Sequence, residues 1–482
     1  MDTTRDDALR VQVQRNSGLE PPEHHVLAVP ASRSFLAWTS KSTASPQQST
    51  RTNIQEFRNP WPSWHKPTSE EVWSNLQWGQ EPPDPCIDLA ASRLEPLPVP
   101  SEPPLDKKPT FDIADWPNSP GAKATRLLSI EKPDFSFSPC RSKVTWLGHA
   151  SILVQLPPLH ASGRPVRCLF DPMFSMRCSP SQIIGPVRSY PPPCNVEALP
   201  PIDAVFISHN HYDHLDCDTI MAIWKNDQQT VRFFVPLGNG QWFIDSGIPA
   251  DRVVELDWWE SAELTHMASE AVSLKIWCTP SQHGSGRPEV GVNVALWSSW
   301  FLESRQPGED PYRVFFAGDT GYQFHDSPSD AKFPPCPAFA EIKVRLGPPN
   351  LLLLPVSVGA TFAYFRSLVY LPDWLSPMPR HSPGVTGANH MPAWDAVRVL
   401  NTMTDGEGAA KERGSPTVAV AMHWGTFITD PIEVSRTLGQ LEWACQKQGV
   451  RFGRYLEDSL GVSRKNEEPW FLALNHGQST CI

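Results

Sequence analysis

The sequence predicts an α/β protein in which two packed β-sheets carry helices on their outer faces. Short runs rich in β-branched and aromatic residues recur from Val144 onward, and stretches compatible with helices lie between several of them. Runs of strands that precede and follow a few helices along the sequence are typical of two packed sheets with helices on their outer faces. The 52 prolines among 482 residues exclude a coiled coil and any fold made only of long helices.

The first 140 residues are rich in proline and show little periodicity. We expect residues 1–56 to be disordered, because a segment of this composition buries little apolar surface. Residues 57–140 differ, because four tryptophans lie close together there: Trp61, Trp64, Trp73 and Trp78. Tryptophan is costly to leave in water, so this extension is predicted to pack on the folded domain.

One folded domain is expected over residues 141–465, followed by a C-terminal tail over residues 466–482. Within the domain, strands are predicted in the runs 144–156, 167–172, 204–209, 231–236, 253–259, 271–280, 290–302, 312–319, 350–356 and 417–424. Helices are predicted over 217–227, 392–403 and 431–448. In the last of these, Ile432, Leu438 and Leu441 fall at helical spacing.

Charge and cysteine usage restrict the class of protein. Lys+Arg 41 against Asp+Glu 52 gives a net charge of −11, which disfavours nucleic-acid binding and a nuclease. The ten cysteines form no C-x-x-C pair, and the acidic start MDTTRDDALR lacks the features of a secretory signal or a mitochondrial presequence. We therefore expect reduced cysteines in an intracellular protein, either cytoplasmic or peripheral on an internal membrane. The apolar stretch 351–371 is interrupted by Pro355, Gly359 and Arg366, so no transmembrane helix is predicted.

A dense cluster of metal-ligating side chains follows the predicted strand AVFI. The segment FISHNHYDHLD contains His209, His211, Asp213 and His214. Imidazole and carboxylate ligands suit Zn²⁺, although ligand type alone leaves Fe and Mn open. A single histidine is more often an ordinary hydrogen-bonded residue, but this density predicts a metal site.

Three further candidates follow predicted strands, namely His283, Asp319 and His423. Taken alone, Asp319 could be a turn or cap residue, and the two histidines could be ordinary polar residues at strand ends. Next to Asp319, Gly318 and Gly321 allow a close approach of the backbone. The three residues complete a set of seven that includes a carboxylate able to bridge two metal ions.

These motifs resemble the metallo-β-lactamase superfamily: HNHYDH at 209–214, SQH at 281–283, FFAGDTGY at 315–322 and AMHWGTF at 421–427. More narrowly, the chain resembles the N-acylphosphatidylethanolamine-hydrolysing phospholipase D family over most of residues 57–460. The supporting segments are NPWPSW at 59–64, TWLGHAS at 145–151, DPMFSMRCSPSQIIGP at 171–186, LPPIDAVFISHNHYDHLD at 199–216, FFVPLG at 233–238 and ELDWWE at 255–260. The resemblance implies an αββα sandwich, with residues 141–465 as its catalytic domain.

The resemblance also implies two zinc ions per chain along one edge of the sandwich. The first zinc would be held by three histidines, the second by two histidines and an aspartate, and one aspartate would bridge them: His209, His211 and His283; Asp213, His214 and His423; Asp319. The implied reaction is attack of a metal-bridging hydroxide on phosphorus, releasing N-acylethanolamine and phosphatidic acid. Two metal ions about 3.5–4 Å apart are suited to this displacement, and no serine or cysteine nucleophile is required.

Further residues of the implied active site are less strongly indicated. His390 matches a family histidine near the substrate and is a candidate for contacting the phosphate or the leaving oxygen. Together with Asp213 and Asp319, it completes the predicted catalytic set. Gln282 is a second candidate for substrate contact, whereas His149 is expected to be a buried structural histidine.

Two alternative functions remain open at this point. The chain could be another hydrolase of the superfamily, acting on a thioester, lactone or amide, or a metal-binding scaffold without catalysis. The complete set of seven ligands disfavours the scaffold. The segments NPWPSW, SPSQ and ELDWWE favour the lipid substrate over a thioester.

A segment longer than the family pattern separates the strand at 350–356 from His390. Within this 361–389 insert, residues 362–375 are rich in aromatic and aliphatic side chains. Trp and Tyr favour the membrane–water interface, so we expect an element that docks peripherally on a membrane and admits a phospholipid substrate. The alternative is that this segment packs on the tryptophan-rich extension or in a homodimer interface.

Overall fold

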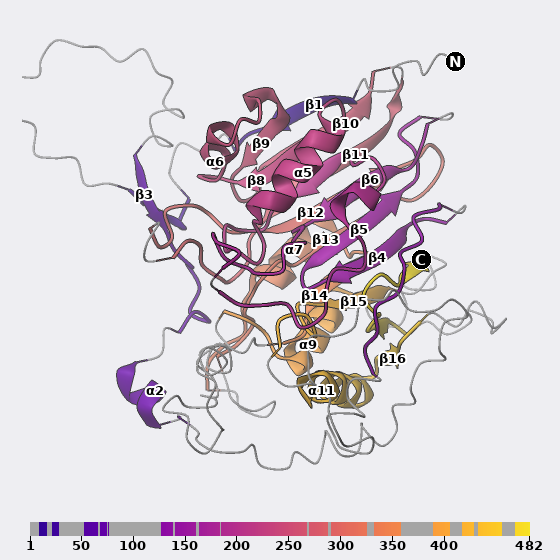
Figure 1. Cartoon of the computed structure of the whole chain (residues 1–482). Coiled ribbons are helices and arrows are strands. Elements are labelled where there is room, and N and C mark those ends of the chain that lie inside the picture. The colour runs from indigo at the N-terminus through magenta and orange to yellow at the C-terminus, as the bar shows by residue number, and fades with distance from the viewer. Residues whose placement is uncertain are drawn as a thin grey trace, which may run out of the picture.

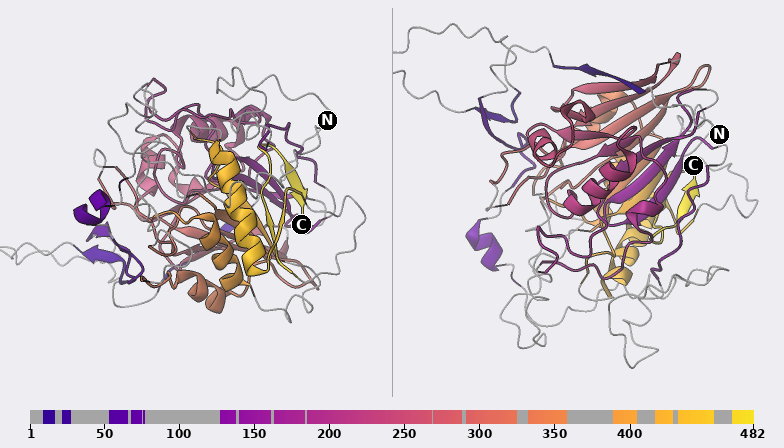
Figure 2. Two further views of the ribbon diagram at one scale, coloured as in Figure 1. Left: turned by 90° about the horizontal axis from the view of Figure 1, so that it is seen from below. Right: turned by 45° about the horizontal axis from the view of Figure 1, so that its top comes forward.

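Two β-sheets pack face to face at the centre of the molecule, and helices cover the outer face of each (Figures 1 and 2). The computed structural model describes residues 9–16, 22–27, 53–65, 68–74, 76, 127–137, 140–160, 163–183, 185–267, 269–287, 291–324, 332–357, 389–404, 417–428, 432–455 and 468–482. The two packed sheets and the helices on their outer faces confirm the predicted αββα sandwich (Figure 1).

The first sheet has nine strands in the order β1-β10-β11-β12-β13-β14-β15-β17-β16. Its strands are β1 Leu9–Gln14, β10 Ser261–His266, β11 Ser269–Thr279, β12 Ser299–Arg305, β13 Tyr312–Phe316, β14 Leu351–Pro355, β15 Val418–Met422, β16 Arg451–Gly453 and β17 Trp470–Leu472. Strands β1 to β13 pair antiparallel along this order, whereas β13, β14, β15, β17 and β16 pair parallel.

The second sheet has seven strands in the order β18-β4-β5-β6-β7-β8-β9. Its strands are β4 Lys143–Gly148, β5 Ser151–Leu156, β6 Val166–Phe170, β7 Ala204–Phe206, β8 Arg232–Pro236, β9 Val253–Leu256 and β18 Ser479–Cys481. A separate two-stranded sheet pairs β2 His25–Leu27 with β3 Ile54–Phe57.

Aromatic side chains join the two large sheets across the core. The ring of Phe170 on β6 stacks on Phe206 of the same sheet at 4.8 Å and on Phe316 of the other sheet at 4.7 Å. All three side chains are buried. Inward-facing residues of two stacked sheets interdigitate in this way, so the core fixes how the two sheet edges face each other.

The helices divide between the two outer faces. Residues Ile220, Ile223 and Phe243 of α5 and α6 pack with the outer face of the seven-stranded sheet. Helix α9 packs on β14 and contacts α7 and α11, which cover the nine-stranded sheet. The helices are α2 Ser69–Ser74, α5 Cys217–Asp227, α6 Gly240–Asp245, α7 Ala338–Leu346, α9 Ala393–Met403 and α11 Ile432–Gln448, with short 3-10 turns η1 Val196–Ala198 and η2 Ala250–Arg252. The three predicted helices thus form within one residue of their expected bounds.

Three expectations need correction, of which two concern the ends of the chain and one concerns a strand. Within residues 1–56, predicted to be disordered, residues 9–14 form β1, because the alternating sequence LRVQVQ pairs with β10. Residues 25–27 and 54–56 also lie in strands, since β2 pairs with β3. Residues 466–482 are not a tail, since β17 lies between β15 and β16 and β18 pairs with β4. In the predicted strand run 290–302, the described residues 291–298 are not in a strand, and β12 begins at Ser299.

The N-terminal strap, which we define as residues 22–27 and 53–65, crosses the surface of the sandwich. Trp61 stacks on Trp258 with ring centroids 5.4 Å apart. Trp73 in α2 is 73% exposed, so the tryptophan-rich extension does not pack as a unit. Trp78 and the predicted docking element 362–375 lie outside the described residues. Among the helices that are described, none is both long and apolar enough to cross a membrane.

Candidate metal centre

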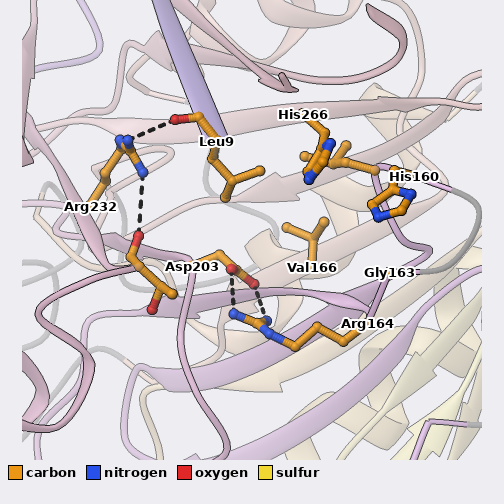
Figure 3. Close-up of a pocket in the computed structure, with 10 residues that line it drawn as sticks. Leu9, His160, Gly163, Arg164, Val166, Asp203, Arg232 and His266 are labelled. Carbon is orange, nitrogen blue, oxygen red and sulfur yellow. Dashed lines mark hydrogen bonds and ion pairs between the residues drawn. The ribbon is translucent and has the colours of Figure 1, made fainter. Parts of the chain in front are cut away.

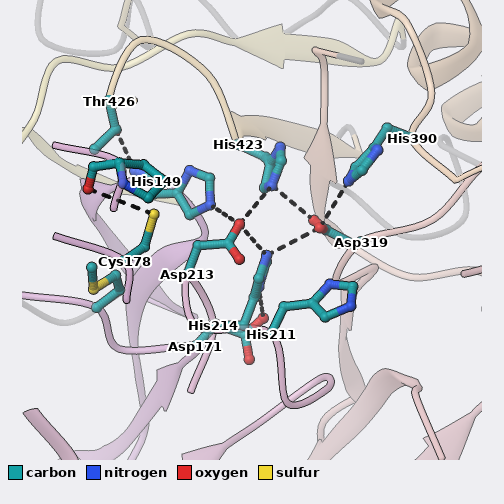
Figure 4. Close-up of polar contacts among 12 residues, drawn as sticks. His149, Asp171, Cys178, His211, Asp213, His214, Asp319, His390, His423 and Thr426 are labelled. Carbon is teal, nitrogen blue, oxygen red and sulfur yellow. Dashed lines mark hydrogen bonds and ion pairs between the residues drawn. The ribbon is translucent and has the colours of Figure 1, made fainter. Parts of the chain in front are cut away.

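The carboxyl ends of six strands bring the predicted ligands to one edge of the sandwich. In the seven-stranded sheet, β4, β6 and β7 run in the same direction, and in the nine-stranded sheet β11, β13 and β15 do so. The polar residues after these strands therefore meet at one place (Figure 4). They are His149 after β4, Asp171 after β6, His209 to His214 after β7, His283 after β11, Asp319 after β13 and His423 after β15.

Three histidines form the first group of potential ligands. His209 Nε2 lies 2.9 Å from His211 Nδ1, which lies 3.4 Å from His283 Nε2. Burial and the neighbouring imidazoles hold the pKa of His209 well below its usual value, and burial lowers the pKa of His283 to about 3. These imidazoles are neutral at pH 7, the form in which histidine binds metal ions.

The second group surrounds the carboxylate of Asp213. Its Oδ2 lies 3.0 Å from His149 Nε2, 3.4 Å from His214 Nε2 and 3.8 Å from His423 Nε2. His149 is buried, as predicted, and burial together with His423 lowers its pKa to about 3. The structure thus adds His149 to the groups that face the second potential metal position.

Asp319 reaches ligands of both groups. Its Oδ2 lies 3.1 Å from His214 Nε2 and 3.8 Å from His283 Nε2, while Oδ1 lies 3.1 Å from His423 Nε2. Burial alone would raise the pKa of Asp319, but the imidazoles of His214, His423 and His390 outweigh it and hold this pKa well below the usual range. An ionised carboxylate between two histidine groups is suited to bridge two cations.

Buried atoms without hydrogen bonds show that these residues fit metal ions. His214 Nε2, His423 Nε2 and Asp319 Oδ1 are all buried, and none makes a hydrogen bond within the described part of the chain. A buried polar atom without a hydrogen bond is rare and costly, whereas a cation among these atoms would coordinate them. The donor set of imidazole nitrogens and carboxylate oxygens is that of a transition-metal site.

The structure places the two weaker candidates differently. His390 Nε2 lies 3.1 Å from Asp319 Oδ2, and its side chain is 20% exposed, so it stands at the open side of the centre. Gln282 is fully buried, and its Oε1 accepts a hydrogen bond from Ser63 of the strap. In this position Gln282 supports the loop that carries His283, and its contact with substrate remains a prediction.

Asp171 was not among the predicted site residues, although it contacts one of the predicted metal ligands, His214. Its Oδ2 lies 2.7 Å from His214 Nδ1 and accepts a 2.6 Å hydrogen bond from Ser208 Oγ. A carboxylate on the far ring nitrogen fixes the tautomer and orientation of a ligating histidine. Its position near the end of the predicted strand run 167–172, in the segment LFDP, was the available signal.

The backbone is strained at this edge. Five residues other than glycine have positive φ in the described part of the chain, and three of them belong to the site: His149 at 51°, Asp171 at 38° and His423 at 60°. Gly318 has φ 60°, and a Cβ there would lie 2.6 Å from that of Ser208, so the predicted close approach next to Asp319 is present. Such conformations persist where the surrounding structure enforces them, and they gather at functional sites.

The strap grips the backbone of one potential ligand. Asn59 Nδ2 donates a 2.7 Å hydrogen bond to the carbonyl oxygen of His283, and Asn59 Oδ1 accepts one of 3.1 Å from the His283 amide. This pair of bonds fixes the loop on which the imidazole sits. The role of Asn59 could not be read from the motif NPWPSW, because it depends on a contact between residues far apart in the sequence.

Removing this clamp is expected to weaken the metal centre without unfolding the protein. We predict that Asn59→Ala lowers metal affinity and activity by roughly 10-fold. Loss of a residue that holds a metal ligand in place typically lowers metal affinity or activity about 10–100-fold. Activity and chelator competition measure the effect, and Asn53→Ala on the same strap is the matched control. Equal losses in both variants would show that Asn59 has no special role.

A cavity elsewhere in the sandwich is not part of this centre. Its walls include Leu9, His160, Arg232 and His266, and its polar side chains are paired, with Arg164 donating 2.7 and 2.8 Å hydrogen bonds to Asp203 (Figure 3). The cavity shares no residue with the cluster around Asp319.

Comparison with known proteins agrees with this geometry. A family model described as a β-lactamase superfamily domain matches residues 166–424. An uncharacterized protein of Mycobacterium bovis is 36% identical over 292 residues, 60% of this chain and 60% of that protein. The N-acyl-phosphatidylethanolamine-hydrolyzing phospholipase D 1 of Caenorhabditis elegans is 34% identical over 286 residues, 59% of this chain and 64% of that protein. The mitochondrial N-acyl-phosphatidylethanolamine-hydrolyzing phospholipase D of Saccharomyces cerevisiae is 29% identical over 291 residues, 60% of this chain and 49% of that protein.

The aligned region spans less than two thirds of the length of each of these relatives. The family model, by contrast, matches more than half of this chain. Together with the two packed sheets and the histidine–aspartate cluster at their edge, this match shows that the chain belongs to the metallo-β-lactamase superfamily of metal-dependent hydrolases.

Proposed function

We propose that this protein is a zinc-dependent phosphodiesterase of the phospholipase D type, which hydrolyses N-acylphosphatidylethanolamine to N-acylethanolamine and phosphatidic acid. The observation that carries the proposal is the position of Asp319 between two groups of ligands. A centre for two cations suits an anionic phosphodiester, because the cations offset the negative charge of the phosphate. An acidic protein would otherwise repel that charge. Two relatives are named for this reaction, which supports the choice of substrate.

Each predicted ligand has a defined task in this proposal. His209, His211 and His283 would hold one zinc ion, and Asp213, His214 and His423 the other, with Asp319 between them. When bound, the two cations supply a nucleophile from water at neutral pH and stabilise the charge that develops on the phosphoryl oxygens. The protein holds the imidazoles neutral on the first side and keeps both carboxylates ionised.

The position of His390 supports a role toward the substrate rather than in the core. Its imidazole is partly exposed and faces Asp319 from the open side of the centre (Figure 4). The oxygen of the leaving N-acylethanolamine needs a proton, and a histidine within reach of the reacting group can donate it or bind the phosphate. We assign His390 this role, with Asp213 and Asp319 as the other members of the catalytic set.

The products formed from a mixed phospholipid substrate test the proposal. Purified zinc-loaded protein should convert N-acylphosphatidylethanolamine to N-acylethanolamine and phosphatidic acid, as read by mass spectrometry. The His211→Ala variant, which lacks one predicted zinc ligand, is the control for a contaminating lipase. Lysophospholipid or free fatty acid as the product would contradict the phospholipase D assignment, and turnover of only a thioester, lactone or amide would favour the alternative hydrolase.

Membrane docking is a further part of the proposal. The sequence predicts docking through residues 362–375, and exposed apolar side chains of one loop, described at residues 176–183 and 185–188, offer additional support. Met176, Ile183 and Val187 are 40%, 83% and 41% exposed on this loop. The loop is closed by a 2.8 Å hydrogen bond from the Arg188 amide to the Met176 carbonyl, and Figure 4 shows Cys178 of the same loop beside the metal centre.

A charged residue at the tip of this loop should weaken binding to liposomes. We predict that Ile183→Asp reduces flotation with neutral phospholipid vesicles, because an aspartate cannot enter the apolar layer. Val344→Asp on α7 is the matched control, since Val344 is equally exposed at 84%. Equal flotation of both variants and the wild type would exclude this loop as a docking element, and the same assay with Phe365→Asp/Leu368→Asp tests the segment 362–375.

A further inference from the structure

A second cluster of potential metal ligands joins the N-terminal strap to the sandwich. His24 and His25 come from the strap, and Asp257 follows strand β9. The ligand atoms of the three side chains lie within 4.8 Å of one another. His24 Nε2 is hydrogen-bonded to Asp257 Oδ1 at 2.8 Å, and His25 Nε2 lies 2.9 Å from Asp257 Oδ2. None of these residues belongs to the centre around Asp319.

The cluster is enclosed in an apolar environment. The side chains of His24, His25 and Asp257 are only 6%, 4% and 5% exposed. Aromatic rings close it on two sides, with Trp258 at 4.2 Å from His24 and Phe57 at 5.4 Å from His25 between ring centroids. A carboxylate in such surroundings needs a positive partner to offset the cost of burial.

The orientation of His25 is the decisive observation. Both ring nitrogens of His25 are buried, and neither makes a hydrogen bond, although Nε2 is 2.9 Å from Asp257 Oδ2. The two atoms are therefore close without pointing at each other. The same relation holds in the catalytic centre, where His423 Nε2 and Asp319 Oδ1 lie 3.1 Å apart and neither is hydrogen-bonded. Ligand atoms arranged in this way converge on a shared point, as they do around a metal ion.

We propose that His24, His25 and Asp257 bind a divalent cation of the zinc type, which fastens the N-terminal strap to the end of β9. Two imidazole nitrogens and one carboxylate oxygen are a common zinc donor set, with water in the fourth position. The site is independent of the proposed function, because it shares no ligand with the catalytic centre.

This cation would hold the part of the strap that carries Asn59. The Arg58 amide donates a 2.9 Å hydrogen bond to the His24 carbonyl, and His25 pairs with Phe57 in the two-stranded sheet. Asn59, the next residue, grips the backbone of His283. Binding of the cation thus orders the strap on which the His283 loop rests.

Counting metal ions on the intact protein tests the site. After expression with zinc and removal of loosely bound metal, native mass spectrometry should show one zinc ion fewer per chain in His25→Ala than in the wild type. Asp257→Asn keeps the shape of the side chain and should show the same loss if His25→Ala does not fold. The difference between variants is decisive whatever number of ions the catalytic centre holds.

A matched control separates this site from a general effect of removing histidines. His160→Ala removes a histidine that lies outside both clusters, with its ring centroid 4.4 Å from that of His266, and this variant should retain the wild-type zinc count. Circular dichroism confirms that the compared variants are folded. An unchanged zinc count in both His25→Ala and Asp257→Asn would overturn the proposal and leave the cluster as a metal-free clasp.

Discussion

Replacing Asp319 with asparagine is expected to lower kcat/KM by about 10³-fold, because losing the metal-ion stabilisation of the transition state costs several kcal/mol. The amide keeps the size of the side chain but cannot carry the charge that joins the two groups of ligands. Asp319 is 2% exposed, and its carboxylate contacts histidines of both groups. Kinetics with a phosphodiester substrate and zinc content per chain measure the effect together.

The control for this variant is another buried aspartate. Asp203→Asn changes a carboxylate that binds Arg164 beside the cavity of Figure 3 and lies outside the metal cluster. It should retain activity within a few-fold of the wild type. Near-normal turnover by Asp319→Asn, or an equal loss in Asp203→Asn, would remove Asp319 from the centre of the mechanism.

The variant His209→Ala should likewise lose most activity while remaining folded.

The second large effect is expected at Asp171, which contacts no substrate in our proposal. Asp171→Asn removes the charge that faces His214 Nδ1 at 2.7 Å. We predict that zinc affinity falls about 10–100-fold, as is usual when the outer partner of a metal ligand is lost. Chelator competition measures the affinity, and excess zinc should restore much of the activity.

Rescue by zinc distinguishes this role from a structural one. Asp171 also accepts hydrogen bonds from the amide and hydroxyl of Ser208, so the fold could suffer as well. Ser208→Ala removes the hydroxyl bond to Asp171 and a 2.9 Å contact of that hydroxyl with His209 Nδ1, so it is not a neutral control. If folded Asp171→Asn binds zinc as tightly as the wild type, orientation of His214 by Asp171 is excluded.

Much of the metal centre could be predicted because its residues follow strands. A strand that ends in a polar residue brings that residue to the sheet edge, and parallel strands share one edge. His209, His283, Asp319 and His423 were recognisable for this reason, and the structure brings them together. Their roles as zinc ligands remain a prediction until metal is measured.

Long-range contacts account for what could not be predicted. Asn59 acts on a residue more than 200 positions away, and no local pattern marks such a contact. Strand β17 has only three residues and is placed by pairing with β15 and β16, so a short terminal segment could not be told from a tail. Strand β1 did carry the alternating pattern of a strand, but the surrounding proline-rich composition obscured it.

Hydrolysis in water labelled with heavy oxygen tests the central claim most directly. If water attacks phosphorus at the metal centre, N-acylphosphatidylethanolamine should yield phosphatidic acid that carries the label and N-acylethanolamine that does not. Mass spectrometry of both products from a single incubation gives the answer. Label in N-acylethanolamine, or in a released fatty acid, would place the attack on carbon and contradict a phospholipase D-type phosphodiesterase.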